Sequence, residues 1–257
     1  MTRSERAFTP SFEPPLPAVL RDVALFIDID GTLLELADRP DTVVVPAGLA
    51  GLLHKLHDGL DGALALVTGR PLVDIAWLFP EFKGDAAGLH GGEWRCGGAI
   101  ATTHLDPKPL LAIAKRFEAL AIAHPGLLVE HKGPSVALHY RNVPEAAALV
   151  ETTMTAAMVE LGPGWQLIAG KAVYEILPAA ASKGQAIDRF LANAPYAGRK
   201  PAFLGDDVTD ESGFAAVLGH GGLAIKVGAG DTLAPYRLAS VPAVHQWLRQ
   251  LAGGGHA

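Results

Sequence analysis

Two carboxylates with a spacing suited to metal-assisted chemistry lie at Asp28 and Asp30, in the stretch Asp-Ile-Asp-Gly-Thr at 28–32. The stretch follows the apolar run 23–27 directly. Residues two apart on an extended chain point the same way, so both side chains can face one crevice. Neighbouring carboxylates that are partly shielded from water repel each other, and a cation offsets that cost. The alternative for this stretch alone is an ordinary loop with aspartate-stabilised turns.

A second acidic cluster follows another short apolar run, 202–204. It reads Gly-Asp-Asp-Val-Thr-Asp-Glu and contains Asp206, Asp207 and Asp210. A single acidic cluster is usually a solvated surface. Two clusters that each follow an apolar strand are more informative, because the strand ends of a parallel sheet share one edge. Hard oxygen ligands from two such loops suit Mg²⁺, which also accepts phosphate oxygens.

Two weaker signals indicate a phosphate ligand. Thr68, Gly69 and Arg70 follow the apolar run 63–67, and a hydroxyl with backbone amides at a strand-to-helix turn can hold phosphate oxygens. Lys183 stands at the start of an expected helix, where its ammonium could offset phosphate charge. Each signal alone is common in turns and on surfaces.

The elements that must position these residues alternate between strand and helix. Apolar runs bounded by turn residues predict buried strands, and apolar residues at helical spacing predict helices. Both ends of the chain show this alternation, which indicates a parallel α/β sheet. The expected strands are 23–27, 63–67, 202–204 and 223–227, and the expected helices are 48–59, 72–78, 182–194 and 211–218.

The middle of the chain has a different pattern, typical of a small α+β unit with one solvated sheet face. Its expected helices are 110–123 and 146–161, and its expected strands are 127–129, 135–140 and 173–177. Ligands of open α/β sheets bind outside the carboxyl ends of the strands. We therefore expect one core from both chain ends and an inserted cap that covers it. The expected divisions are a loose arm at 1–17, core at 18–104, cap at 105–178 and core at 179–257.

Composition narrows the class of protein. The 257 residues can bury a sizeable core, and the net charge of −6 lacks the basic footprint of a nucleic-acid binder. The single cysteine, Cys96, suits a reducing compartment. Neither a signal peptide nor a membrane span is indicated, so we expect a cytoplasmic protein that acts on a small molecule. The sequence does not define an oligomeric state.

The four motifs, in their order along the chain, resemble those of the haloacid dehalogenase superfamily of phosphatases. The resemblance covers 28–32, 67–70, Lys183 and 205–211. It implies a Rossmann-like core with a parallel sheet, and the insertion resembles the larger, C2-type cap of that superfamily.

Further stretches are similar to trehalose-6-phosphate phosphatases, and together the similarity runs from about Val23 to Leu238. They are 89–95, 130–141, 173–178, 205–211 and 224–232. This chain departs from the usual residues of that family at two positions. Gly92 stands where an alanine is usual, and Leu177 stands where an arginine is common. The similarity implies hydrolysis of trehalose 6-phosphate to trehalose and phosphate, the last step of trehalose biosynthesis.

The resemblance also implies roles for individual residues. Asp28 is the nucleophile, and Asp30 is the acid and then the base. Mg²⁺ is held by Asp28, by the backbone carbonyl of Asp30 and by Asp206, while Asp207 and Asp210 orient its waters. Thr68 and Lys183 neutralise and fix the transferring group. The implied substrate contacts are Gly69, Arg70, His90, Gly91, Glu93, Glu130, Lys132, Ser135 and Glu175.

Three alternatives remain open at the level of sequence. The first is a phosphatase of the same fold for sucrose phosphate, a mannosyl-phosphoglycerate or a hexose phosphate. The second is a phosphomutase, which shares the same start, and the third is a sugar-phosphate sensor without activity. A sensor would usually have lost a catalytic carboxylate, whereas Asp28, Asp30 and Asp206 are all present.

Overall fold

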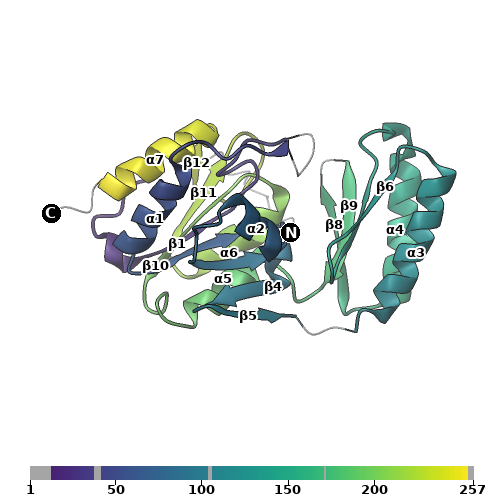
Figure 1. Ribbon diagram of the computed structural model, residues 1–257, viewed down its shortest axis with the longest axis horizontal. Helices are drawn as coiled ribbons and strands as arrows, with labels where there is room; N and C mark the ends of the chain where they lie inside the picture. Colours follow the sequence, from purple (N-terminus) through teal and green to yellow (C-terminus); the bar gives the residue numbers. More distant parts are fainter. Residues whose placement is uncertain (1–12, 38–41, 104–105, 171, 254–257) are drawn as a thin grey trace, which may run out of the picture. The chain divides into compact units, whose positions relative to one another are not determined.

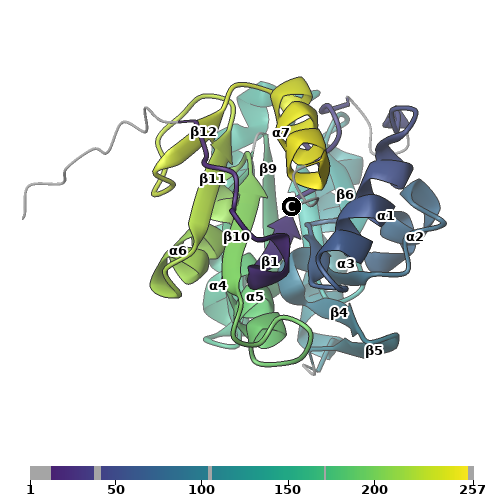
Figure 2. The ribbon, with the colours of Figure 1, turned by 90° about the vertical axis from the view of Figure 1, so that its left-hand side faces the viewer.

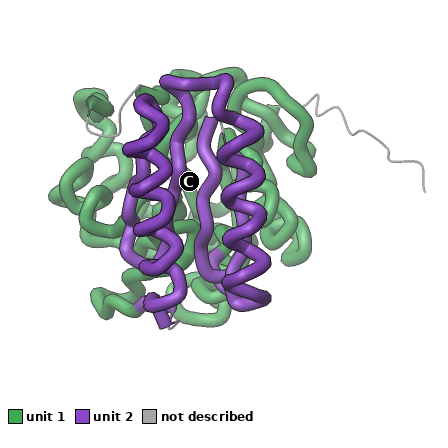
Figure 3. Tube along the Cα trace, turned by 90° about the vertical axis from the view of Figure 1, so that its right-hand side faces the viewer, with its two compact units in different colours: residues 1–101, 182–257 green, residues 102–181 purple. Residues whose placement is uncertain are grey.

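The protein folds as two compact units, one formed by both ends of the chain and the other inserted between them. The structure, a computed structural model, describes residues 13–37, 42–103, 106–170 and 172–253. The larger unit comprises Met1–Ala101 and Ser182–Ala257, and the smaller comprises Thr102–Ala181 (Figure 3). Most of the expected N-terminal arm and the expected division at 104/105 lie outside the described residues.

The larger unit is built on an eight-stranded sheet in the order β12-β11-β10-β1-β2-β3-β4-β5 (Figure 1). The strands from β12 to β3 are parallel to their neighbours, and β4 is antiparallel to β3. All five residues of β1 are buried, as expected for a parallel strand covered on both faces. The bounds are β1 Val23–Ile27, β2 Leu64–Val67, β3 Asp85–Gly88, β4 Glu93–Cys96, β5 Ala99–Thr102, β10 Lys200–Gly205, β11 Leu223–Val227 and β12 Tyr236–Leu238.

Helices cover both faces of this sheet (Figure 2). Helix α1 packs against α7, and α5 packs against α6. Their apolar faces join the strands in one core, in which the ring of Phe26 stacks on those of Phe190 and Tyr196. The bounds are α1 Leu49–Gly59, α2 Leu72–Leu78, α5 Lys183–Leu191, α6 Glu211–Gly219 and α7 Val241–Gly253.

The smaller unit is an antiparallel sheet in the order β6-β7-β9-β8 with two helices packed beside each other on one face. Val136, Leu138 and Ile176 of its strands are fully buried with apolar residues of both helices. The bounds are α3 Lys108–Ala123, β6 Leu128–His131, β7 Val136–His139, α4 Ala147–Leu161, β8 Trp165–Gly170 and β9 Val173–Pro178.

The predicted fold class, a parallel α/β core with an inserted α+β unit, is confirmed. The helix predicted at 182–194 forms over Lys183–Leu191, and Ser182 is its N-cap, whose side chain accepts a hydrogen bond from the Gln185 amide at 3.1 Å. The strand predicted at 127–129 lies one to two residues later, at Leu128–His131. Within the described residues, no helix has the length and apolar character needed to cross a membrane.

Candidate active site

The polar residues singled out in the sequence meet at the carboxyl edge of three adjacent parallel strands. Strand β1 lies between β10 and β2. Asp28 follows β1, Thr68 follows β2, and Asp206 follows β10. The Asp28 amide extends the pairing one residue past β1 by donating to the Leu204 carbonyl at 3.0 Å. The fold therefore brings together residues that are up to 178 positions apart in the sequence.

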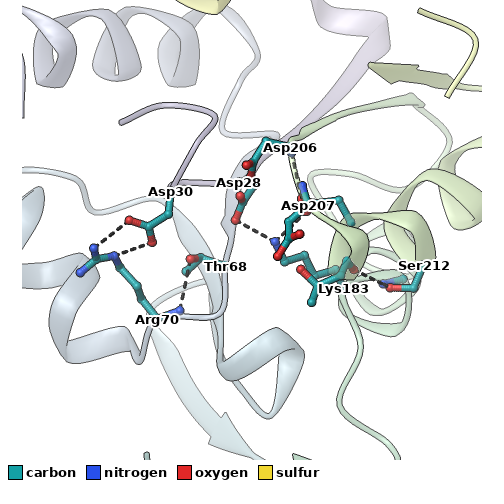
Figure 4. Close-up of polar contacts among 11 residues, drawn as sticks. Asp28, Asp30, Thr68, Arg70, Lys183, Asp206, Asp207 and Ser212 are labelled. Carbon is teal, nitrogen blue, oxygen red and sulfur yellow. Dashed lines mark hydrogen bonds and ion pairs between the residues drawn. The ribbon is translucent and has the colours of Figure 1, made fainter. Parts of the chain in front are cut away.

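A buried ammonium links two of the acidic loops. Lys183 Nζ donates to Asp28 Oδ1 at 2.8 Å and to Asp210 Oδ1 at 2.6 Å (Figure 4). The exposed fractions of these residues are 3% for Lys183, 4% for Asp28 and 0% for Asp210. Lys183 is the first residue of α5, so the position of this helix places the positive charge of the ammonium at the carboxyl ends of the strands.

Asp210 shapes the loop that carries Asp206. Its Oδ2 accepts hydrogen bonds from the amides of Asp206 at 3.0 Å and Asp207 at 2.9 Å. Asp207 and Asp210 form a capping box, in which the side chain of each accepts a hydrogen bond from the backbone amide of the other. Because both oxygens of Asp210 already accept from an amide or an ammonium, Asp210 acts as a support for the loop. Lys226 supports the same loop from β11 by donating to the carbonyls of Asp206 and Val227.

Glycine is needed where the two acidic loops approach each other. Gly31 has a φ of +77°, in the left-handed region that favours glycine. A Cβ at this position would lie 2.2 Å from a carboxylate oxygen of Asp206. The glycine after Asp30 therefore serves the close approach of the β1 and β10 loops as well as the turn.

The charge balance of this edge favours a cation. One oxygen each from Asp28, Asp206 and Asp210 lies within 4.8 Å of the others. Among the residues that the structure describes, Lys183 is the one lysine whose ammonium forms an ion pair with these carboxylates. Burial raises the pKa of Asp28 well above its usual value, although Lys183 opposes this, and burial with the neighbouring Asp210 raises the pKa of Asp206 to about 6. The geometry and the donor oxygens fit a hard divalent cation, which would favour the ionised carboxylates.

Asp30 lies two residues beyond Asp28 but faces a different partner. Arg70 Nε donates to Asp30 Oδ2 at 2.6 Å, and Arg70 Nη2 donates to Asp30 Oδ1 at 2.7 Å. Figure 4 shows Asp28 turned toward Lys183 and Asp30 turned toward Arg70. The Arg70 amide also donates to Thr68 Oγ1 at 3.2 Å, which ties the arginine to the predicted phosphate loop.

The segment that contains His90, Gly91 and Glu93 packs on that loop. The His90 amide donates to the Thr68 carbonyl at 2.9 Å, and Glu93 Oε1 accepts from the amide of Leu72, the first residue of α2, at 2.5 Å. A Cβ at Gly69 would lie 2.8 Å from the His90 ring. A Cβ at Gly91 would lie 2.8 Å from the Ser182 carbonyl. These residues therefore support the loop at 68–72 and the start of α5.

In the smaller unit, Glu130, Lys132, Ser135 and Glu175 form a polar network. Lys132 Nζ lies 3.5 Å from Glu130 Oε2 and 3.4 Å from Glu175 Oε2, and Ser135 Oγ donates to Glu175 Oε1 at 2.6 Å. In the strand register, Ala137 stands between the two glutamates. The small alanine leaves room above the sheet for the lysine that bridges them.

The pH dependence of stability should report on this network. Burial alone would raise the pKa of Glu130, but the His139 hydrogen bond at 2.9 Å and the charge of Lys132 lower it below the usual value. A lowered folded-state pKa stabilises the fold above the unfolded pKa of about 4.3, and this stabilisation is lost as the pH falls through the folded value. We expect Glu130→Gln to cost about 1 kcal/mol of unfolding free energy at pH 7, because the site is partly solvated.

Thermal unfolding of both proteins across pH 3–8 measures this effect. The difference between wild type and Glu130→Gln should be largest at neutral pH and should shrink as the pH falls through the lowered folded-state pKa of Glu130. Glu145→Gln, at an exposed position, serves as the control and should change little. A difference that is constant with pH would show that the charge of Glu130 does not stabilise the network.

Two residues that contact the candidate site residues, Lys226 and His139, were not assigned a role from the sequence. Lys226 lies within the apolar run 223–227, and a lysine inside such a run indicates a buried charge that needs a partner. In the structure its side chain is 4% exposed on the buried strand β11. His139 lies in the predicted strand 135–140 and shares a face with Ala137, opposite Val136 and Leu138, which is typical of an ordinary half-exposed strand. Its contact with Glu130 depends on the pairing of β6 with β7, which the sequence does not specify.

The parallel sheet, its acidic carboxyl edge and the inserted unit correspond to the fold of haloacid dehalogenase-like hydrolases. A solved haloacid dehalogenase-like hydrolase from Bacteroides thetaiotaomicron matches 89% of this chain with a TM-score of 0.66 at 14% sequence identity, which shows the shared fold. The C-terminal domain of the Candida albicans trehalose-6-phosphate phosphatase matches 97% of this chain and 99% of that domain, with a TM-score of 0.82 and 21% identity.

The chain belongs to the trehalose-phosphatase family, whose model matches residues 26–242. It is 41% identical over 236 residues to the trehalose-6-phosphate phosphatase of Escherichia coli strain K12, covering 91% of this chain and 88% of that protein. It is also 41% identical over 242 residues to a probable trehalose-phosphate phosphatase of Sinorhizobium fredii, covering 94% and 91% of the two chains.

Proposed function

We propose that this protein hydrolyses trehalose 6-phosphate to trehalose and phosphate through a phosphoryl group carried on Asp28. The observation that carries the proposal is the cluster of Asp28, Asp206 and Asp210, joined by Lys183, at the carboxyl edge of the sheet. Membership in the trehalose-phosphatase family and the two relatives with 41% identity support the substrate.

In the first half-reaction, an oxygen of Asp28 attacks phosphorus and the bond between phosphorus and the sugar oxygen breaks. Asp30 gives its proton to the departing sugar oxygen. Lys183 holds the Asp28 carboxylate through Oδ1 and balances negative charge on the transferring group. Thr68 and the backbone amides after β2 orient the phosphate oxygens, because positioning and electrostatics supply most of the rate in phosphoryl transfer.

In the second half-reaction, water attacks the phosphorus of the aspartyl-phosphate. Asp30, now ionised, takes a proton from this water, and phosphate leaves with the bonding electron pair returning to the Asp28 carboxylate. One carboxyl group thus gives a proton in the first step and recovers a proton in the second. Each cycle consumes one water and restores both aspartates.

Magnesium is the proposed cofactor, held by Asp28, the Asp30 carbonyl and Asp206. When bound, it would neutralise phosphate oxygens and favour the ionised form of the surrounding carboxylates. Asp207 and Asp210 would orient its waters, and Asp210 also holds the loop of Asp206 through two amides.

Removal of the divalent ion should therefore abolish turnover and lower stability. We expect chelation to reduce phosphate release by at least about 100-fold, with recovery on adding Mg²⁺. Saturating Mg²⁺ should also raise the unfolding temperature by several degrees, since a ligand of the folded state stabilises it. The Asp206→Asn variant should lose most of this thermal shift, whereas Asp188→Asn, at a surface position, should keep it. Unchanged activity and unfolding temperature after chelation would contradict a metal site.

The smaller unit is the proposed sugar-recognition element. Glu130, Lys132, Ser135 and Glu175 present charged and hydroxyl groups suited to sugar hydroxyls, and their mutual contacts hold them in place before substrate arrives. The resemblance also implies His90, Gly91 and Glu93 as sugar contacts. The hydrogen bonds of His90 and Glu93 to the loop at 68–72 support an additional positioning role for these two residues. We place the activity in the cytoplasm, where the single Cys96 would remain reduced.

A panel of sugar phosphates tests the proposed function. Phosphate release with Mg²⁺ should be selective for trehalose 6-phosphate over sucrose phosphate, mannosyl-phosphoglycerate and glucose 6-phosphate. Free phosphate with no isomerised sugar phosphate distinguishes the reaction from that of a mutase. A higher kcat/KM for another member of the panel would contradict the substrate, and no release from any member would contradict the activity.

A further inference from the structure

The ion pair between Asp30 and Arg70 gives the arginine a more specific role than contact with substrate. Both oxygens of the Asp30 carboxylate accept hydrogen bonds from one guanidinium, at 2.6 and 2.7 Å. Such two-point pairs fix the orientation of a carboxylate as well as its charge. The Arg70 side chain is 9% exposed and that of Asp30 is 31% exposed, so the pair lies at the boundary between the core and the solvent.

The arginine is held in place from several sides. Its amide donates to Thr68 Oγ1 at 3.2 Å, and its carbonyl accepts from the Leu89 amide at 3.0 Å. Nη1 lies 3.7 Å from Asp74 Oδ2, on the first turn of α2. A Cβ at Gly88 would lie 2.7 Å from the Arg70 carbonyl, so the end of β3 packs closely against the Arg70 backbone. Arg70 is therefore a fixed support against which Asp30 is oriented.

The geometry of the pair suits Asp30 as a hydrogen-bond acceptor. The guanidinium has donors only, and it fixes both carboxylate oxygens in one orientation. The base of the second half-reaction must present an acceptor oxygen in a fixed orientation to the attacking water. In the first half-reaction, a leaving group that needs no proton does not depend on Asp30.

We propose that Arg70 is a positioning residue that orients the Asp30 side chain for the hydrolysis of the aspartyl-phosphate. The inference rests on the proposed function and assigns Arg70 to its second step. Arg70 then acts through Asp30, and its removal slows the loss of phosphate from Asp28 more than the arrival of phosphate on Asp28.

Pre-steady-state kinetics with p-nitrophenyl phosphate separate these two steps. Nitrophenolate is a good leaving group that needs no proton, so its burst reports formation of the aspartyl-phosphate and its steady-state release reports hydrolysis. In Arg70→Met we expect a burst rate within about twofold of wild type and a steady-state rate lowered roughly 10- to 100-fold. Arg70→Lys, which keeps the charge but not the two-point geometry, should give an intermediate steady-state rate.

A double-mutant cycle tests whether Arg70 acts through Asp30. Adding Arg70→Met to Asp30→Asn should change the steady-state rate by less than about twofold, because the base is already gone. Arg116→Met, which removes a surface arginine paired with Glu160, is the control and should match wild type. Thermal unfolding verifies that each variant is folded.

Two results would overturn this role for Arg70. A burst rate that falls as much as the steady-state rate would show direct contact with the phosphate. A full additional loss in the double variant would show action independent of Asp30. Failure of the proposed function itself is distinguishable, because Asp28→Asn would then keep the burst.

Discussion

Replacing Asp28 with asparagine is expected to lower kcat for trehalose 6-phosphate by roughly 10³- to 10⁶-fold. The change removes the nucleophile, and residues that act as one catalytic unit show losses of this order when the reacting group is removed. The amide oxygen of asparagine can still accept the hydrogen bond that Lys183 donates to Asp28 Oδ1 at 2.8 Å. Phosphate release under saturating substrate and Mg²⁺ measures the loss.

The same substitution should leave the fold intact. Asp28 is buried among carboxylates that raise its pKa together with burial, so a neutral amide relieves repulsion with Asp206 and Asp210. We expect an unfolding temperature, measured without metal, equal to or above that of wild type. Asp58→Asn, at an exposed position, is the matched control for activity. A kcat within tenfold of wild type in Asp28→Asn would rule out Asp28 as the nucleophile.

Replacing Lys183 with methionine is expected to reduce both stability and turnover. Burial alone would lower the pKa of Lys183, but Asp210 and Asp28 raise it, so the ammonium stays charged at neutral pH. Its loss leaves two buried carboxylates without their common partner, which costs about 3–5 kcal/mol of unfolding free energy. For a chain of roughly this size, each kcal/mol lowers the unfolding temperature by about 2–4 °C.

A second substitution separates the two effects of Lys183. Adding Asp210→Asn to Lys183→Met removes one of the unpaired carboxylates, so part of the lost stability should return while turnover stays low. Lys55→Met, at an exposed position, should change the unfolding free energy by no more than about 0.5 kcal/mol. Equal unfolding temperatures of wild type and Lys183→Met would contradict the structural role of this ammonium.

The parallel core was predictable because its strands are buried on both faces. The run 23–27 is continuously apolar, and the structure buries every residue of β1. The strand β3, Asp85–Gly88, was not predicted, because Asp-Ala-Ala-Gly has low strand propensity. It forms because β2 and β4 pair with it on its two sides, and this tertiary contact outweighs the local preference.

The candidate site was also predictable only in part, since the sequence indicated which loops meet but not all of the side-chain contacts. The order of acidic motifs placed Asp28 and Asp206 at one sheet edge, because the carboxyl ends of parallel strands coincide there. The partner of Asp30 was not predictable, since Arg70 reaches it through a side-chain conformation that spacing does not encode. The partner of Lys226 was not predictable either, because its contact with the Asp206 carbonyl depends on the pairing of β10 with β11.

Chemical trapping of the phosphorylated residue tests the central claim most directly. The Asp30→Asn variant, in which hydrolysis of the aspartyl-phosphate should be slow, is mixed with trehalose 6-phosphate and Mg²⁺, quenched in acid and reduced with borohydride. Reduction converts an aspartyl-phosphate to homoserine, which peptide mass spectrometry locates. We predict homoserine at position 28 only when substrate is present. Homoserine at another position, or none at position 28 while one equivalent of trehalose is released, would contradict covalent catalysis by Asp28.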